Sequence, residues 1–234
     1  MLCRFLPWNS GGMTDPFEAR GTAAGTLGQF VYGDAPLDTW VAQGADPAGE
    51  PRSSFEQARQ LIHAGQPDEA VKIWRRIAVT EGLESRQALQ AWHFLRQAGY
   101  PPRADQAKLV LGVVAEMPVQ GAHDLLAAYQ DGSARYLNYS GKAVVWEDRS
   151  VTEIQAAISA WLARGQVIAS SVGPWDKPSL PPLPLGQVRV AALTPSGPHF
   201  GQGPAAALSA DPLAGSFLTT ATSLMRLIID RAMA

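Results

Sequence analysis

The sequence predicts an α+β fold, with an N-terminal helical unit followed by an antiparallel sheet (a meander plus a hairpin) covered by amphipathic helices. Three observations predict it. Strand-like runs over residues 124–147 are separated by two turn signals, Asp131-Gly132 and Ser140-Gly141. Before them, apolar residues recur at helical spacing in three consecutive segments. After them come a further hairpin pattern and a long apolar helix pattern.

Composition narrows the function classes. The chain has 234 residues, of which 46% are hydrophobic and 17% charged, which excludes global disorder. A net charge of −2 gives no basic footprint, so we expect no nucleic-acid partner. No apolar run has the roughly 20 residues that a bilayer span needs, so we expect no membrane partner. The single Cys3 fits a reducing compartment, and we expect a cytoplasmic protein.

Residues 1–53 are expected to form an N-terminal arm and a linker. The first part, Met1 to Gly12, lacks the features of a secretory signal and is interpreted as a start-site or expression extension, because Met13 opens a more usual beginning. Two apolar patches follow, whose aromatic residues Phe30, Tyr32 and Trp40 are expected to cover part of the main domain. Residues 43–53 have the composition of a linker.

Residues 54–102 are expected to form a three-helix unit. A capping box of Ser54 and Gln57 starts the first helix, which Gly65 stops. Pro67 starts the second, which runs to Gly82. The third spans residues 84–98 and is closed by a glycine and two prolines.

The first two helices, Phe55 to Ala78, resemble one tetratricopeptide-type helical hairpin. The resemblance rests on Ala58, Leu61, Gly65, Glu69-Ala70 and Trp74. It implies a helical surface for protein contact. No second copy follows at the family's period of roughly 34 residues, so an ordinary three-helix packing unit is the alternative.

Residues 103–234 are expected to form the α+β domain. A continuous apolar run from Leu109 to Ala115, ended by Pro118, predicts a strand buried on both faces. Glu116 at its end is expected to reach solvent, with a buried acid of raised pKa as the alternative. Two-residue loops would set the meander's register. The expected pairs are Tyr129 with Ala134, Leu126 with Leu137, Tyr136 with Val145, and Arg135 with Trp146, the last in cation–π contact.

A second capping box, Ser150 to Glu153, introduces a helix expected to end at Gly165. Val167 to Val172 could be strand or helix. The proline-rich residues 173–186 are interpreted as a stiff crossover loop, with a polyproline II ligand as the alternative. Val188 to Leu193 predicts a strand whose hairpin returns through His199, and Asp211 caps a closing helix.

The most site-like stretch is Pro195 to Pro204, because its glycines allow close approach and its histidine titrates near neutrality. The candidate binding residues are His199, Phe200, Gly201, Gln202, Arg135 and Trp146. Ser196, His199 and Asp211 lie close in sequence, but no nucleophile-elbow motif accompanies them. The four histidines are scattered singly, so we expect no metal and no cofactor.

Three functions remain open. The first is a non-enzymatic interaction or regulatory protein whose partner is another protein. The second is a small-ligand sensor, because the order of strands and helices is broadly similar to profilin-like or roadblock-type domains, with Trp146, Tyr136 and Trp161 expected to line its pocket. The third is a hydrolase that uses His199.

Overall fold

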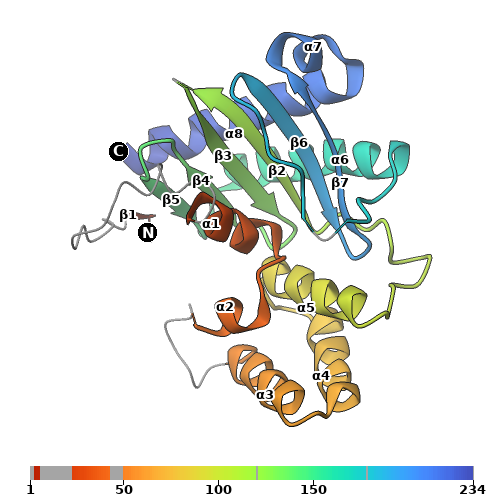
Figure 1. Cartoon of the computed structure of the whole chain (residues 1–234). Helices are drawn as coiled ribbons and strands as arrows, with labels where there is room; N and C mark the ends of the chain where they lie inside the picture. The colour runs from red at the N-terminus through yellow and green to blue at the C-terminus, as the bar shows by residue number, and fades with distance from the viewer. Residues whose placement is uncertain (1–2, 6–22, 43–49, 120, 178, 234) are drawn as a thin grey trace.

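The computed structural model describes residues 3–5, 23–42, 50–119, 121–177 and 179–233 (Figure 1). Its elements are β1 (Cys3–Phe5), α1 (Ala23–Tyr32), α2 (Leu37–Ala42), α3 (Arg52–His63), α4 (Pro67–Val79), α5 (Ser85–Gln97), β2 (Gly112–Val119), β3 (Ala122–Tyr129), β4 (Ala134–Leu137), β5 (Ala143–Trp146), α6 (Thr152–Ser171), β6 (Gln187–Thr194), β7 (Gly197–Pro204), α7 (Ala205–Ala210) and α8 (Pro212–Met233). The expected α+β class is confirmed.

One antiparallel sheet organises the chain, in the strand order β1-β5-β4-β3-β2-β6-β7. Helices α6 and α8 cover one face, which we call the helix face (Figure 1). Helix α1 and the described part of the loop after α6 (residues 172–177 and 179–186) cross the other, which we call the polar face. Helices α3, α4 and α5 pack together beside the sheet around their own apolar core.

The meander is confirmed, but its register is shifted by one residue from the prediction. Both loops have three residues, because Tyr129 N–H donates to the Ser133 carbonyl at 2.9 Å and Asn138 N–H to the Lys142 carbonyl at 2.9 Å. Each is a turn closed by a glycine at positive φ, 82° for Gly132 and 83° for Gly141. The pairs are therefore Leu126 with Tyr136 and Tyr136 with Val144.

The shift moves side chains between faces, so the predicted Arg135–Trp146 contact is wrong. Arg135 lies opposite Val145, and Trp146 lies opposite Ala134. Successive residues of a strand point to opposite faces. Trp146 consequently packs in the helix-face core. The guanidinium of Arg135 does not meet its ring, and the contact between the two residues is a hydrogen bond to the Trp146 main-chain carbonyl at 3.2 Å.

Helix α6 corrects two predictions and settles a third point that the sequence left open. It starts at Thr152 without a side-chain cap, since the Ser150 hydroxyl bonds Asp148 instead. It does not stop at Gly165, where a Cβ would overlap Val113 of β2. This glycine lets the helix approach the sheet closely. Val167 to Val172 is settled as helix up to Ser171. Its central ring, Trp161, is fully buried and packs on Phe217 of α8 with centroids 5.2 Å apart.

Helix α8 begins after Asp211, whose carboxylate accepts the amides of Leu213 at 2.9 Å and Ala214 at 2.8 Å, as expected of an N-cap. Its span Pro212–Ala232 is also the one described helix long and apolar enough to cross a membrane. Length and composition alone are weak evidence of a span. One stripe of the helix is fully buried in the helix-face core, as in a core helix of a globular domain: Phe217, Ala221, Leu224 and Ile228.

The three-helix packing is present, but the first helix begins at Arg52 rather than at a Ser54 cap. Ser54 lies inside the helix and donates to the Glu50 carboxylate at 2.7 Å. The residues expected as a linker therefore include the start of α3. Residues 43–49 and most of Met1 to Gly12 lie outside the described residues.

The expected arm divides between the sheet and the helices. Tyr32 of α1 packs on the polar face, whereas Trp40 of α2 packs on the core of the helical unit and stacks on Phe30 at 5.5 Å. Between them, Gln90 of α5 binds the main chain of Ala35 twice, accepting its N–H at 3.0 Å and donating to its carbonyl at 2.8 Å.

Candidate functional site

Strand alternation divides the predicted Pro195–Pro204 site between the two faces of the sheet. Ala192 of the helix face lies opposite His199, and Arg189 of the polar face lies opposite Gln202. His199 and Gly201 therefore point toward α6, and Phe200 and Gln202 point away from it. Arg135 is on β4, four strands from β7, or about 19 Å at the usual strand spacing. The six predicted residues do not form one site.

His199 is fully buried and holds two segments of the chain together. Its Nδ1 lies 2.8 Å from the Val172 carbonyl at the end of α6, and its Nε2 lies 3.1 Å from the Ser196 hydroxyl. Ser196 in turn donates to the Ala107 carbonyl at 2.6 Å. Burial lowers the pKa of the His199 imidazole below its ordinary value, which favours the neutral ring.

This arrangement supplies part of a nucleophilic site but not the whole. A serine and a histidine lie within reach of each other, yet the group that orients the imidazole is a main-chain carbonyl. Asp211, which lies close to them in sequence, is occupied as the predicted cap of α8. The ring has no exposed surface through which a substrate could approach. The geometry is that of a structural clamp.

Three exposed apolar side chains lie in or next to the segments that His199 and Ser196 hold. Leu109 is 51% exposed, Val167 44% and Val172 39%. Two hydrogen bonds tie the segment of Leu109 to α6: Gln166 Nε2 donates to the Lys108 carbonyl at 3.0 Å, and Lys108 Nζ to the Ser170 carbonyl at 3.4 Å. We call Leu109, Val167 and Val172 the α6-end surface. Exposed apolar side chains mark protein contacts when they form one contiguous patch, whereas single ones are ordinary.

The polar face carries a buried network that the sequence reading missed. Arg189 donates to Glu116 at 2.8 Å and, through Nε and Nη2, to Gln202 Oε1 at 3.1 and 2.9 Å. Tyr32 also donates to Glu116, at 2.8 Å. The prediction that Glu116 reaches solvent is therefore wrong: its side chain is 18% exposed, because Arg189 and Tyr32 hold it against the sheet. The sign of this network in the sequence is Arg189, a charged residue within the otherwise apolar run of β6.

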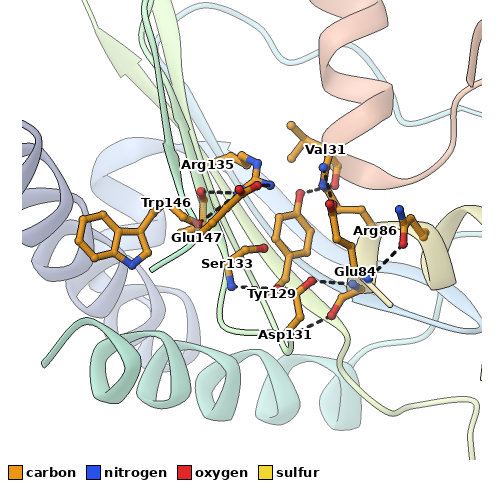
Figure 2. Close-up of polar contacts among 12 residues, drawn as sticks. Val31, Glu84, Arg86, Tyr129, Asp131, Ser133, Arg135, Trp146 and Glu147 are labelled. Carbon is orange, nitrogen blue, oxygen red and sulfur yellow. Dashed lines mark hydrogen bonds and ion pairs between the residues drawn. The ribbon is translucent and has the colours of Figure 1, made fainter. Parts of the chain in front are cut away.

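A second network fixes the helical unit to the meander (Figure 2). The carboxylate of Asp131 accepts Ser85 N–H at the start of α5 at 2.7 Å, and Ser85 Oγ accepts Asp131 N–H at 3.1 Å. Tyr129 donates to the Val31 carbonyl at 2.7 Å. Arg135 pairs with Glu147 at 2.8 Å. The predicted binding residue Arg135 is thus engaged within the protein, with its side chain 8% exposed.

A small pocket lies where α1, α5 and the β6–β7 hairpin meet. Its volume is about 10 Å³, which holds about one water molecule. Asp34 and Arg96 line it, and Asp34 Oδ1 has no hydrogen-bond partner among the described residues. Burial raises the pKa of Asp34 to about 7, although Arg96 partly opposes the shift. The pocket is too small for an organic ligand.

Comparison with known proteins identifies no relative. No family model matches the chain, and no curated protein and no solved structure matches it. Within the described residues, no group of three His, Cys, Asp or Glu side chains could hold a metal ion. Nothing in the comparisons bears on the tetratricopeptide-like hairpin, which stays a prediction.

Proposed function

We propose that the protein is a non-enzymatic interaction or regulatory protein, and that another protein binds at the α6-end surface. One observation carries the proposal. Leu109, Val167 and Val172 are exposed while the segments that bear them are fixed by hydrogen bonds, including those of the buried His199 and Ser196.

Rigidity is the relevant property, because single exposed apolar residues are ordinary on protein surfaces. A surface that is already ordered loses less conformational entropy when a partner binds. The clamp bonds the segment before Leu109 through Ala107 and the end of α6 through Val172. In this proposal Pro195 to Pro204 does not contact the partner, and its Ser196 and His199 hold the segments that carry the contact surface.

The small-ligand sensor gains no support from the rings expected to line its pocket. Trp161 packs directly on Phe217. Trp146 and Tyr136 pack on the same helix-face core. These side chains fill the space that a ligand would need.

Affinity capture from the native cell, read by mass spectrometry, tests the proposal. The bait should recover a stoichiometric protein partner, and the double variant Leu109→Lys with Val167→Glu should lose it. The matched control is Val79→Glu, which changes a 63% exposed valine on α4 and should keep the partner. Recovery of no stoichiometric partner, or equal recovery by both variants, would reject the α6-end surface.

A further inference from the structure

The loop between α6 and β6 has neither helix nor strand among its described residues and crosses the polar face (Figure 1). Irregular loops of this length are uncommon in compact domains and are usually binding loops, lids or linkers. We call residues 179–184 the strap. Pro178, part of the predicted polyproline motif, lies outside the described residues.

The sheet holds the strap through its main-chain carbonyls. Arg189 Nη2 donates to the Pro181 carbonyl, and Gln202 Nε2 to the Pro182 carbonyl at 3.5 Å. Leu180 and Phe200 both pack against the polar-face core, and the Phe200 ring meets Trp175 of the same loop edge to face, with centroids 5.2 Å apart. The loop is thus held by two hydrogen-bond donors and by an apolar surface that includes an aromatic ring.

These contacts suit a proline-rich chain for a chemical reason. Proline offers a carbonyl but no N–H, so consecutive prolines present acceptors alone. Arg189 and Gln202 present donors to the strap, because the acceptor oxygen of Gln202 is occupied by Arg189 and Glu116 Oε1 by Arg189 and Tyr32. An ordinary peptide would bring N–H groups that these occupied oxygens are not free to accept.

The donors are positioned without the strap. Arg189 is 5% exposed, and Glu116 and Gln202 fix its guanidinium from the sheet itself. The strap, by contrast, is largely on the surface, with Ser179, Pro182 and Pro184 exposed. Removing it would leave an ordered site rather than a collapsed one.

We propose that Arg189, Phe200 and Gln202 form a binding surface for extended proline-rich segments, which the strap occupies within the chain and a partner's proline-rich segment takes when the strap is displaced. Recognition of polyproline II segments by aromatic rings and hydrogen-bond donors is a common mode of peptide binding. The surface is separate from the α6-end surface, so each can fail without the other.

The test uses the full chain with residues 179–184 replaced by a glycine-serine segment of equal length, and a fluorescent peptide of residues 174–186. Fluorescence anisotropy should show saturable binding. Phe200→Ala in the same background should weaken it at least about tenfold, because that ring forms the apolar part of the site. A peptide with Pro181→Ala and Pro182→Ala should bind more weakly, since it restores two N–H groups. Equal binding of both peptides, or no binding by the folded chain, overturns the proposal.

A second variant covers the case in which the replaced chain does not fold. Pro181→Ala with Pro182→Ala in the otherwise intact chain weakens the strap as an internal competitor. Such a competitor acts at an effective concentration near millimolar, so the variant should bind the peptide at least about tenfold more tightly than the unchanged chain. Equal affinity of the two chains contradicts the proposal. Leu109→Lys should leave peptide binding unchanged.

Discussion

The two faces of the sheet differ in how they hold what covers them. On the helix face, α6 and α8 pack through fully buried apolar side chains such as Trp161, Phe217 and Ile158. On the polar face, α1 and the strap also pack on buried apolar side chains, but they add directional bonds from Tyr32 to Glu116 and from Arg189 to Pro181. Apolar packing tolerates exchange of similar shapes, whereas a buried ion pair is costly unless each partner is satisfied. We therefore expect the helix face to contribute most of the stability, and the polar face to select which segments can cover it.

The largest effect is expected on the helix face. Trp161→Ala should lower the free energy of unfolding by about 3–5 kcal/mol, because it empties a fully buried site. Trp161→Phe should cost about 1–2 kcal/mol, since the indole N–H has no hydrogen-bond partner in the described part of the chain. Urea unfolding measures both. A loss below about 1 kcal/mol for Trp161→Ala would contradict its placement.

Arg189→Met tests the polar face. It should cost about 2–4 kcal/mol, because Glu116 loses the cation that compensates its burial. Adding Glu116→Met should recover part of that loss, since no unpaired charge then remains. A double-mutant cycle from urea unfolding gives the coupling. Additive losses would show that the pair is not coupled and would weaken the contrast between the faces.

Asp34→Asn sharpens the contrast through pH. The carboxyl has a pKa of about 7 in the fold against an ordinary value of 3.8, so the folded state retains a proton that the unfolded state releases between these values. The native protein should therefore lose stability as pH rises from about 4 to 7. Asn cannot ionise, so its gain over the native chain should be larger at pH 8 than at pH 5 by about 1–3 kcal/mol.

Chemical denaturation at the two pH values measures that gain. The matched control is Asp230→Asn, at an exposed position of α8. A gain that does not change between pH 5 and pH 8 would show that Asp34 is ionised in the fold.

The smallest effects concern the two meander turns. Alanine in the left-handed region costs about 1–2 kcal/mol, which is the loss expected for Gly141→Ala, where a Cβ meets nothing within 4 Å. Gly132→Ala should cost more, because its Cβ would displace the side-chain amide of Gln155 on α6, which donates to the Gly132 carbonyl at 2.9 Å. Thermal unfolding ranks the two variants. Equal losses would place the Gly132 turn away from α6.

The sequence is sufficient for the meander, the three-helix packing and the capped helix α8, because turn glycines, helical spacing and Asp211 are local signals. It is insufficient for the register. Asp131-Gly132 and Ser140-Gly141 fit a two-residue or a three-residue loop, and only the hydrogen bonds at Tyr129 and Asn138 distinguish them. The predicted helix end at Gly165 is wrong for a related reason. A glycine that ends a helix and a glycine that lets a helix pack closely on a strand cannot be distinguished in the sequence.

The site could not be predicted because its contacts join distant residues. Glu116 meets Arg189 from 73 positions away and Tyr32 from 84. The sequence predicts a site at His199 because the side chain can titrate near neutrality, but its burial depends on the ends of α6 and of the loop before β2. Strand alternation was available in the sequence, and applied to Pro195–Pro204 it would have separated His199 from Phe200.

The double bond between Gln90 and Ala35 has a consequence for the whole chain. It secures a short connection whose two sides belong to different cores, with Tyr32 on the sheet and Val41 among the helices. Removing the chain before residue 50 would thus expose apolar side chains of both regions at once, and Glu116 would lose the hydrogen bond from Tyr32. Helices α1 and α2 therefore stabilise both regions, and a fragment prepared without them would reproduce neither region as it exists in the intact molecule.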